Sequence, residues 1–224
     1  MMKELALHVL DITENSVRGD AETIEIVIEE NLKEIIELYH EGKIHHIGIS
    51  NFNLEECKKS KAILDQEHIP LYGVQNHYSI LSRDWEKKGV VEWCKENHVL
   101  FWAWAVLEEG ILVDPKVKTS GSLMKLIFSR KKRRLQSLFA LMDTIAQKYK
   151  ITIAQVAMAF CSTKGIIPVC GCRRPYQVLQ LYEAVDIQLT DEEVKQLEHE
   201  ADRLNITILG ADMFRFAVKN KKQK

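Results

Sequence analysis

The chain has 224 residues, of which 46% are hydrophobic, and its formal net charge is −1 at pH 7. This length suits one globular domain with a sizeable core, and a near-neutral charge without any nucleic-acid motif argues against nucleic acid as a partner. No apolar run approaches the roughly 18 residues that cross a bilayer, no basic-then-apolar leader opens the chain and the five cysteines are scattered, so we expect a cytoplasmic protein with no membrane partner.

The N-terminal segment has a pattern of its own. Residues 4–16 predict an amphipathic helix, and residues 21–30, in which isoleucine alternates with other side chains, predict a strand. This pair resembles the N-box of the gyrase and histidine-kinase type ATPases over residues 4–30, which implies Mg²⁺ binding by Asn15 and a general base at Glu14. No glycine-rich motif of those ATPases follows, so the alternative is a helix and a strand without nucleotide binding. We expect residues 1–31 to form this N-terminal helix-strand segment and residues 32–224 to form the main domain.

Four short apolar runs alternate with amphipathic stretches through the rest of the chain. This alternation predicts βα units with a parallel sheet, because parallel strands are buried on both faces only where helices cover them. Asn53, Thr152 and Thr190 each precede a helical pattern and have side chains that suit an N-cap. The strands are expected at residues 44–49, 71–74, 100–104 and 166–169, and the helices at residues 53–64, 84–97, 135–148, 152–162 and from Thr190 onward.

The stretch at residues 39–52 reads Tyr-His-Glu-Gly-Lys-Ile-His-His-Ile-Gly-Ile-Ser-Asn-Phe. It resembles the aldo-keto reductase signature, in which a helix ends at Gly, a buried strand follows, and Ser-Asn-Phe opens the next loop. Residues 72–76, 100–105 and 167–175 follow at plausible spacing and resemble the ends of later strands of that family. The resemblance covers about residues 32–202 and implies the C-terminal half of a barrel. The expected fold is therefore α/β: an incomplete TIM-type (β/α) barrel of about four parallel βα units, with an N-terminal helix-strand addition.

The resemblance implies nicotinamide contacts at the ends of three strands. Ser50, Asn51 and Gln75 would hydrogen-bond the nicotinamide carboxamide, and Trp104 would stack on the nicotinamide ring. The chemistry is suitable, because an amide needs both a donor and an acceptor, and a flat aromatic face fixes which side of the ring delivers hydride. Loops at the carboxyl ends of barrel strands are where such ligands bind.

The resemblance also implies a clamp for the adenosine phosphate after the last strand. Gly171 would let the backbone approach a phosphate, Arg173 would offer a bidentate fork, and Gln177 would supply an amide at a helix start. The adjacent Arg173 and Arg174 favour NADP(H), with NAD(H) left open. Leu181 stands where the family usually has an asparagine that contacts adenine, so adenine recognition would differ.

The family's catalytic Asp, Tyr, Lys and His belong to its first four βα units, and the resemblance assigns none of them here. No catalytic residue and no metal site are therefore expected; Cys170 and Cys172 lack the second pair that a zinc site needs.

The expectation is an NADP-dependent aldo-keto reductase-type oxidoreductase fragment that keeps the cofactor half. The alternative is a non-catalytic binding or interaction module, or a relic of a gene fusion or truncation. An open sheet edge would need a cover, so self-association or a complementary half barrel is an expected partnership beside the dinucleotide.

Overall fold

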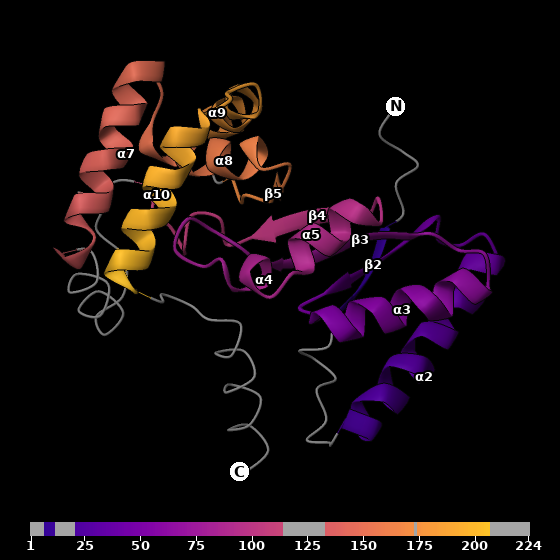
Figure 1. The fold of residues 1–224 in the computed structure, drawn as a ribbon. Coiled ribbons are helices and arrows are strands. Elements are labelled where there is room, and N and C mark those ends of the chain that lie inside the picture. Colours follow the sequence, from indigo (N-terminus) through magenta and orange to yellow (C-terminus); the bar gives the residue numbers. More distant parts are fainter. Residues whose placement is uncertain (1–6, 12–20, 114–132, 173, 207–224) are drawn as a thin grey trace, which may run out of the picture. The chain divides into compact units, whose positions relative to one another are not determined.

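The computed structural model describes residues 7–11, 21–113, 133–172 and 174–206 (Figure 1). Their five strands are hydrogen-bonded in the order β1-β2-β3-β4-β5. The described residues belong to two compact units, the first containing residues 7–11, 21–76 and 84–102, and the second residues 77–83, 103–113, 133–172 and 174–206. No helix within these ranges is long and apolar enough to cross a membrane.

The strands confirm the four apolar runs and add one. They are β1 (Leu7–Asp11), β2 (His46–Ser50), β3 (Leu71–His77), β4 (Leu100–Trp104) and β5 (Ile167–Pro168). β1 pairs with β2 and β2 pairs with β3, both in parallel. A register shift opposite Ile47 and Gly48 interrupts the second pairing, as a β-bulge does.

The expected N-terminal helix followed by a strand is wrong in both elements. Residues 7–11 form β1, which lies beside β2 from the pair Leu7↔His46 to the pair Asp11↔Ser50. The conformation of this segment depends on its pairing with β2, which is distant in sequence. A short window of sequence therefore cannot predict it. Asn15 and Glu14 lie outside the described residues.

Residues 21–30, expected to be a strand, form the first half of helix α2 (Ala21–His40). The helix runs without interruption through Asn31 and Leu32, where the N-terminal segment was expected to end. Its buried side chains are Ile28, Leu32, Ile35 and Ile36, which recur at the spacing of one helix face. The run of alternating isoleucines is too short to distinguish the two-residue repeat of a strand from the 3.6-residue repeat of a helix. The apolar residues beyond residue 30 continue at helical spacing, which favours the helix.

Three of the helices begin at the predicted caps. Asn53 caps α3 (Leu54–Gln66), Thr152 caps α8 (Ile153–Thr163) and Thr190 caps α10 (Asp191–Leu204), each in a capping box with the residue three positions later. Such boxes satisfy backbone N–H groups that have no partner inside the helix. Two further helices of the second unit are α7 (Gln136–Tyr149) and α9 (Pro175–Val185).

The helix expected over residues 84–97 is divided in two. α4 (Asp84–Lys87) and α5 (Val90–Glu96) are separated by Gly89, whose φ of 82° lies in the left-handed region. Glycine adopts this conformation without the steric cost that a Cβ imposes, so the chain can stop one helix and start another there. The inward side of the pattern is confirmed, because Trp85, Val90 and Trp93 are buried.

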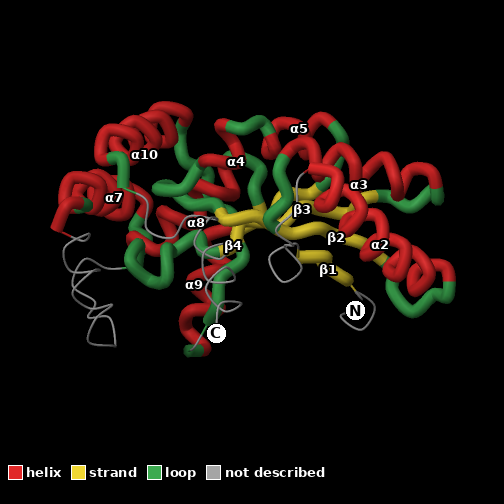
Figure 2. Tube along the Cα trace, turned by 90° about the horizontal axis from the view of Figure 1, so that it is seen from below, coloured by secondary structure: helices red, strands yellow, loops and turns green. Residues whose placement is uncertain are grey.

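In the first unit, helices cover one face of the sheet. Figure 2 shows α2, α3 and α5 on the same side of β1, β2 and β3. Ile47, Ile49 and Val74 are fully buried, as Cys57 and Leu64 of α3 are, and they form the apolar layer of this unit. Strand residues that are only half-buried include Tyr72, Gln75 and Trp102, and these carry the polar and aromatic groups of the sheet.

In the second unit, helices pack on one another. α8 contacts both α7 and α9, and α7 also contacts α10. The fully buried side chains of these helices include Leu138, Met142, Val156, Phe160 and Leu197. α9 differs from the other helices because most of its large apolar side chains face solvent: Tyr176, Val178, Leu179, Tyr182 and Val185 are between 50% and 73% exposed.

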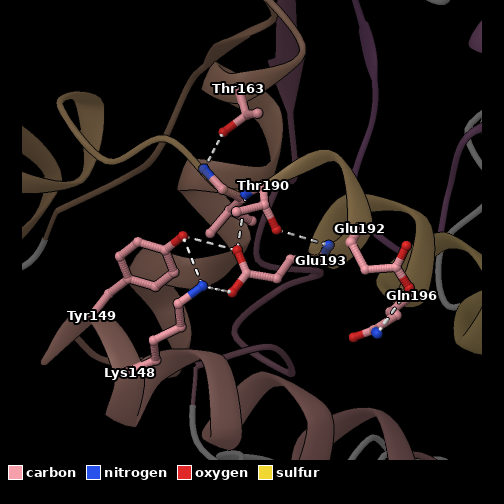
Figure 3. A network of polar contacts seen from close by, with 8 residues as sticks. Lys148, Tyr149, Thr163, Thr190, Glu192, Glu193 and Gln196 are labelled. Atoms are coloured by element: carbon pink, nitrogen blue, oxygen red, sulfur yellow. Dashed lines mark hydrogen bonds and ion pairs between the residues drawn. The ribbon is translucent and has the colours of Figure 1, made fainter.

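A polar network joins the end of α7 to the start of α10 (Figure 3). Glu193 accepts hydrogen bonds from Lys148 Nζ (2.7 Å), the Tyr149 hydroxyl (2.9 Å) and the Thr190 amide (2.8 Å). Burial raises the pKa of Glu193, but the hydrogen bonds from Lys148, Thr190 and Tyr149 outweigh it and lower the pKa from its ordinary 4.5 to about 2. Glu193 is therefore ionised throughout the neutral and mildly acidic range.

The substitution Glu193→Gln tests this network. A carboxylate whose pKa is lowered by folding stabilises the folded state above its unfolded pKa and loses that contribution as the pH falls. We expect the variant to lose about 1 kcal/mol of unfolding free energy at neutral pH. This figure already allows for solvent screening, because Lys148 is exposed and its attraction to Glu193 is weakened by water. The difference from the wild type should shrink as the pH falls from 4.5 towards about 2. Urea unfolding across this range measures it, with Glu192→Gln, an exposed neighbour, as control; a pH-independent difference would contradict the assignment.

Candidate cofactor site

Ser50, Asn51 and Gln75 are brought together at the ends of β2 and β3. The Gln75 carbonyl accepts hydrogen bonds from Ser50 Oγ (2.9 Å) and from the Asn51 amide (3.1 Å), and Asn51 Nδ2 donates to Ser50 Oγ (3.2 Å). The bend after β2 depends on Asn51, whose φ of 61° is one that asparagine tolerates better than most residues. Three of the expected nicotinamide residues thus form one connected group.

The hydrogen bonds assign different capacities to these three side chains. Ser50 donates its only hydroxyl proton to Gln75, so towards a ligand it can act only as an acceptor. The Gln75 side chain is half-buried, and its amide makes no hydrogen bond with any residue in the described ranges. An unengaged amide offers one acceptor oxygen and two donor hydrogens, which are the groups a carboxamide needs.

Trp104 ends β4 and stacks on His77. The ring centroids of His77 and Trp104 are 4.7 Å apart and the rings are inclined by 26°. The Tyr78 amide donates to the Trp104 carbonyl (3.2 Å), which holds the two strand ends together. One face of the indole is therefore occupied by His77, a residue that the sequence pattern had not singled out.

The expected phosphate segment begins beside β4 and ends in a helix cap. The Val169 amide donates to the Ala103 carbonyl (2.8 Å), so the chain enters this segment next to the strand that carries Trp104. A Cβ added at Gly171 would meet no heavy atom within 4 Å, and this stretch of backbone is open to approach. Gln177 uses its side-chain oxygen to accept from the Arg174 amide (2.9 Å) at the start of α9. Arg173 lies outside the described residues.

The departure at Leu181 has a packing explanation. Leu181 is half-buried and packs against Ala154, Met158 and Ala184, where α8 and α9 meet. An asparagine there would bury a polar amide among apolar groups, which costs free energy unless it is hydrogen-bonded. The leucine thus serves the contact between the two helices.

The Cys170 thiol is not activated. Burial raises the pKa of Cys170 to about 11, with a further contribution from Cys172, so the thiol is protonated at neutral pH. The thiolate is the nucleophilic and metal-binding form. Within the ranges that the structure describes, no three His, Cys, Asp or Glu side chains are grouped so that they could hold a metal ion.

Parallel strands with polar and aromatic side chains at their carboxyl ends define an α/β protein of the barrel class, in which ligands bind at those ends. The chain belongs to the aldo/keto reductase family, whose sequence model matches residues 3–201. This match begins at residue 3 rather than near Leu32, so the family covers the segment for which an ATPase resemblance was expected.

Individual relatives agree with this assignment. The chain is 28% identical over 172 residues to the chloroplastic pyridoxal reductase of Arabidopsis thaliana, covering 75% of this chain and 46% of that protein. It is 26% identical to the NADPH-dependent alpha-keto amide reductase of Saccharomyces cerevisiae, covering 79% of this chain and 52% of the relative. The chain thus spans about half the length of these curated relatives.

Solved structures support the fold. The glycerol dehydrogenase of Gluconobacter oxydans aligns with a TM-score of 0.72 at 22% identity, over 92% of this chain and 62% of that one. An aldo-keto reductase of Klebsiella pneumoniae, solved in complex with NADPH, aligns with a TM-score of 0.62 at 22% identity, over 88% of this chain and 58% of that one.

Proposed function

We propose that this chain binds NADP(H) through the cofactor half of an aldo-keto reductase fold and lacks the family's catalytic tetrad. The observation that carries the proposal is the connected group of Ser50, Asn51 and Gln75 at the ends of β2 and β3, in a member of this oxidoreductase family. Gln75 would hydrogen-bond the nicotinamide carboxamide, Ser50 would accept from it, and Trp104 would stack on the ring. When bound, the cofactor supplies the hydride, and these residues hold and orient it.

The preference for NADP(H) over NAD(H) rests on charge. Arg173 and Arg174 would pair with the additional phosphate, since a guanidinium presents a planar fork of donors to phosphate oxygens. Gly171 would let the backbone approach, and Gln177, already part of the cap of α9, would hold the segment in shape. Relatives named for NADP(+) and NADPH support this preference. Parallel fluorescence titrations with NADPH and NADH test it, and equal dissociation constants would count against it.

We further propose that a complementary half barrel, or a second copy of the chain, covers the open parts of the structure. β5 exposes Ile167, and α9 exposes a row of apolar side chains that includes Leu179 and Tyr182. Contiguous exposed apolar patches of this kind often mark surfaces that bind another protein. A second candidate function, a non-catalytic binding or interaction module, is favoured by the same exposed helix.

Trp104→Ala should weaken NADPH binding more than Trp102→Ala. Both tryptophans are half-buried, but the Trp102 ring packs over Gly73 and beside Tyr72, deeper in the strands, whereas Trp104 ends its strand. Loss of one stacked aromatic ring should raise the dissociation constant roughly 3- to 10-fold for Trp104→Ala. Titration followed by quenching of the remaining tryptophans measures it, and equal losses for the two variants would remove Trp104 from the site.

A further inference from the structure

Glu108 is a fully buried carboxylate with an unusual set of partners. Its Oε1 atom accepts a hydrogen bond from the Ser79 hydroxyl and lies 3.2 Å from His77 Nε2. Its Oε2 atom is buried and has no hydrogen-bond partner within the described residues. A buried carboxylate is costly unless it is paired, so His77 and Ser79 are what retain Glu108 in this position.

The loop after β4 is bent to bring Glu108 there. Ala105, Glu108 and Glu109 have φ values of 55°, 47° and 54°, in the left-handed region that side chains other than glycine rarely adopt. The Glu108 amide donates to the Ala105 carbonyl (2.8 Å), which closes the turn. Three such residues within five positions store conformational strain, and strain of this kind collects at functional sites.

Ser79 fixes the other side of the pair. Its oxygen accepts hydrogen bonds from the amides of Leu81 (3.1 Å) and Ser82 (3.0 Å), and its single proton therefore goes to Glu108. Glu108 is thus held by its own turn and by a second turn, and its Oε1 atom has a defined position relative to His77. The hydrogen bond between His77 Nε2 and Glu108 Oε1 sets the plane of the imidazole.

The imidazole plane in turn sets the indole plane. His77 is only 3% exposed, and it covers one face of Trp104 at a centroid separation of 4.7 Å. A flat ligand cannot stack on the face that His77 covers. His77 is behind the ring and would not touch that ligand.

We propose that the Glu108–His77 pair is a positioning device, which covers one face of the Trp104 indole and fixes the plane in which the ring would stack on the nicotinamide. The inference rests on the proposed function, because it takes the nicotinamide as the ligand of Trp104. His77 and Glu108 are positioning residues: they act through Trp104, and their removal should loosen the ring before it affects the rest of the fold.

Fluorine NMR of the protein labelled with fluorotryptophan tests the device without cofactor. The chain has four tryptophans, so four resonances are expected, and Trp104→Phe identifies the one from Trp104. In Glu108→Gln and His77→Ala, the Trp104 resonance should shift or broaden while the resonances of Trp85, Trp93 and Trp102 stay in place. His77→Phe keeps a ring but loses the hydrogen bond to Glu108, so its Trp104 resonance should also shift or broaden. Glu109→Gln, an exposed neighbour with the same charge change, should alter nothing.

The same variants are then titrated with NADPH. Glu108→Gln, His77→Phe and His77→Ala should each raise the dissociation constant roughly 3- to 10-fold. A folded Glu108→Gln variant with an unchanged Trp104 resonance and unchanged affinity overturns the inference. If His77→Ala does not fold, Glu108→Gln and His77→Phe decide. Absence of NADPH binding by the wild-type protein would defeat the proposed function instead, while the resonances would still report whether the pair positions Trp104.

Discussion

The purified chain is expected to bind NADPH and to reduce aldehydes roughly 10²- to 10⁴-fold more slowly than a complete reductase, since that is what a positioned general acid contributes. Hydride transfer to a carbonyl carbon leaves charge on the oxygen, and a tyrosine supplies the proton in the reductases that the sequence resembles. Under the proposed function, no tyrosine of this chain takes that role. Cofactor binding and proton donation come from different strand loops of the barrel, so one can be retained without the other.

The measurement is NADPH consumption with a panel of aldehydes, followed in the nicotinamide absorbance band. The chain is assayed alone and mixed with a separately expressed front half of a related reductase. Turnover only on mixing would identify a complementary half barrel as the partner. Turnover by the chain alone that survives substitution of each tyrosine would defeat the proposed absence of the tetrad. Binding without turnover in either assay would favour the non-catalytic module.

Gly73→Val should destabilise the first unit by roughly 1–3 kcal/mol, the usual cost of overpacking. A Cβ at this position would lie 2.4 Å and 2.7 Å from two atoms of the Trp102 ring and 2.9 Å from the Leu100 carbonyl oxygen. Ring and backbone both belong to β4, so relief requires the strand itself to move. Interiors packed as closely as proteins are do not absorb such a shift without loss.

Urea unfolding of Gly73→Val measures this loss, and two further variants define its origin. Gly171→Ala is the matched control and should be near neutral, because a Cβ there meets no atom within 4 Å and its φ is not in the left-handed region. Trp102→Leu added to Gly73→Val should recover part of the loss by removing the ring, while the contact with the Leu100 oxygen remains. A single Gly73→Val variant as stable as the wild type would show that β3 and β4 are not held as closely as the ring contact implies.

Local sequence was sufficient wherever the deciding interaction is itself local. The caps at Asn53, Thr152 and Thr190 were predictable because a cap side chain bonds to backbone groups two or three residues away. The signature around Ser50 and Asn51 was likewise readable, since its strand and its tight bend are consecutive in the chain. The division of the helix at Gly89 was harder to predict from the sequence, because a glycine can either interrupt a helix or lie within one.

Tertiary structure decided whatever depends on partners far apart in the chain. Residues 7–11 are a strand because β2 pairs with them, and residues 21–30 are the first half of α2, whose later turns bury Leu32, Ile35 and Ile36. His77 is 27 positions from Trp104 and 31 positions from Glu108, and Glu108 lies on a bent loop. No sequence spacing therefore predicts that these three residues are in contact. By itself the sequence indicated the family and the positions of four strands, and it predicted the residues that would face a nicotinamide. Which face of the indole His77 covers was decided by the folded chain, because a stacking contact exists only once two strands lie side by side.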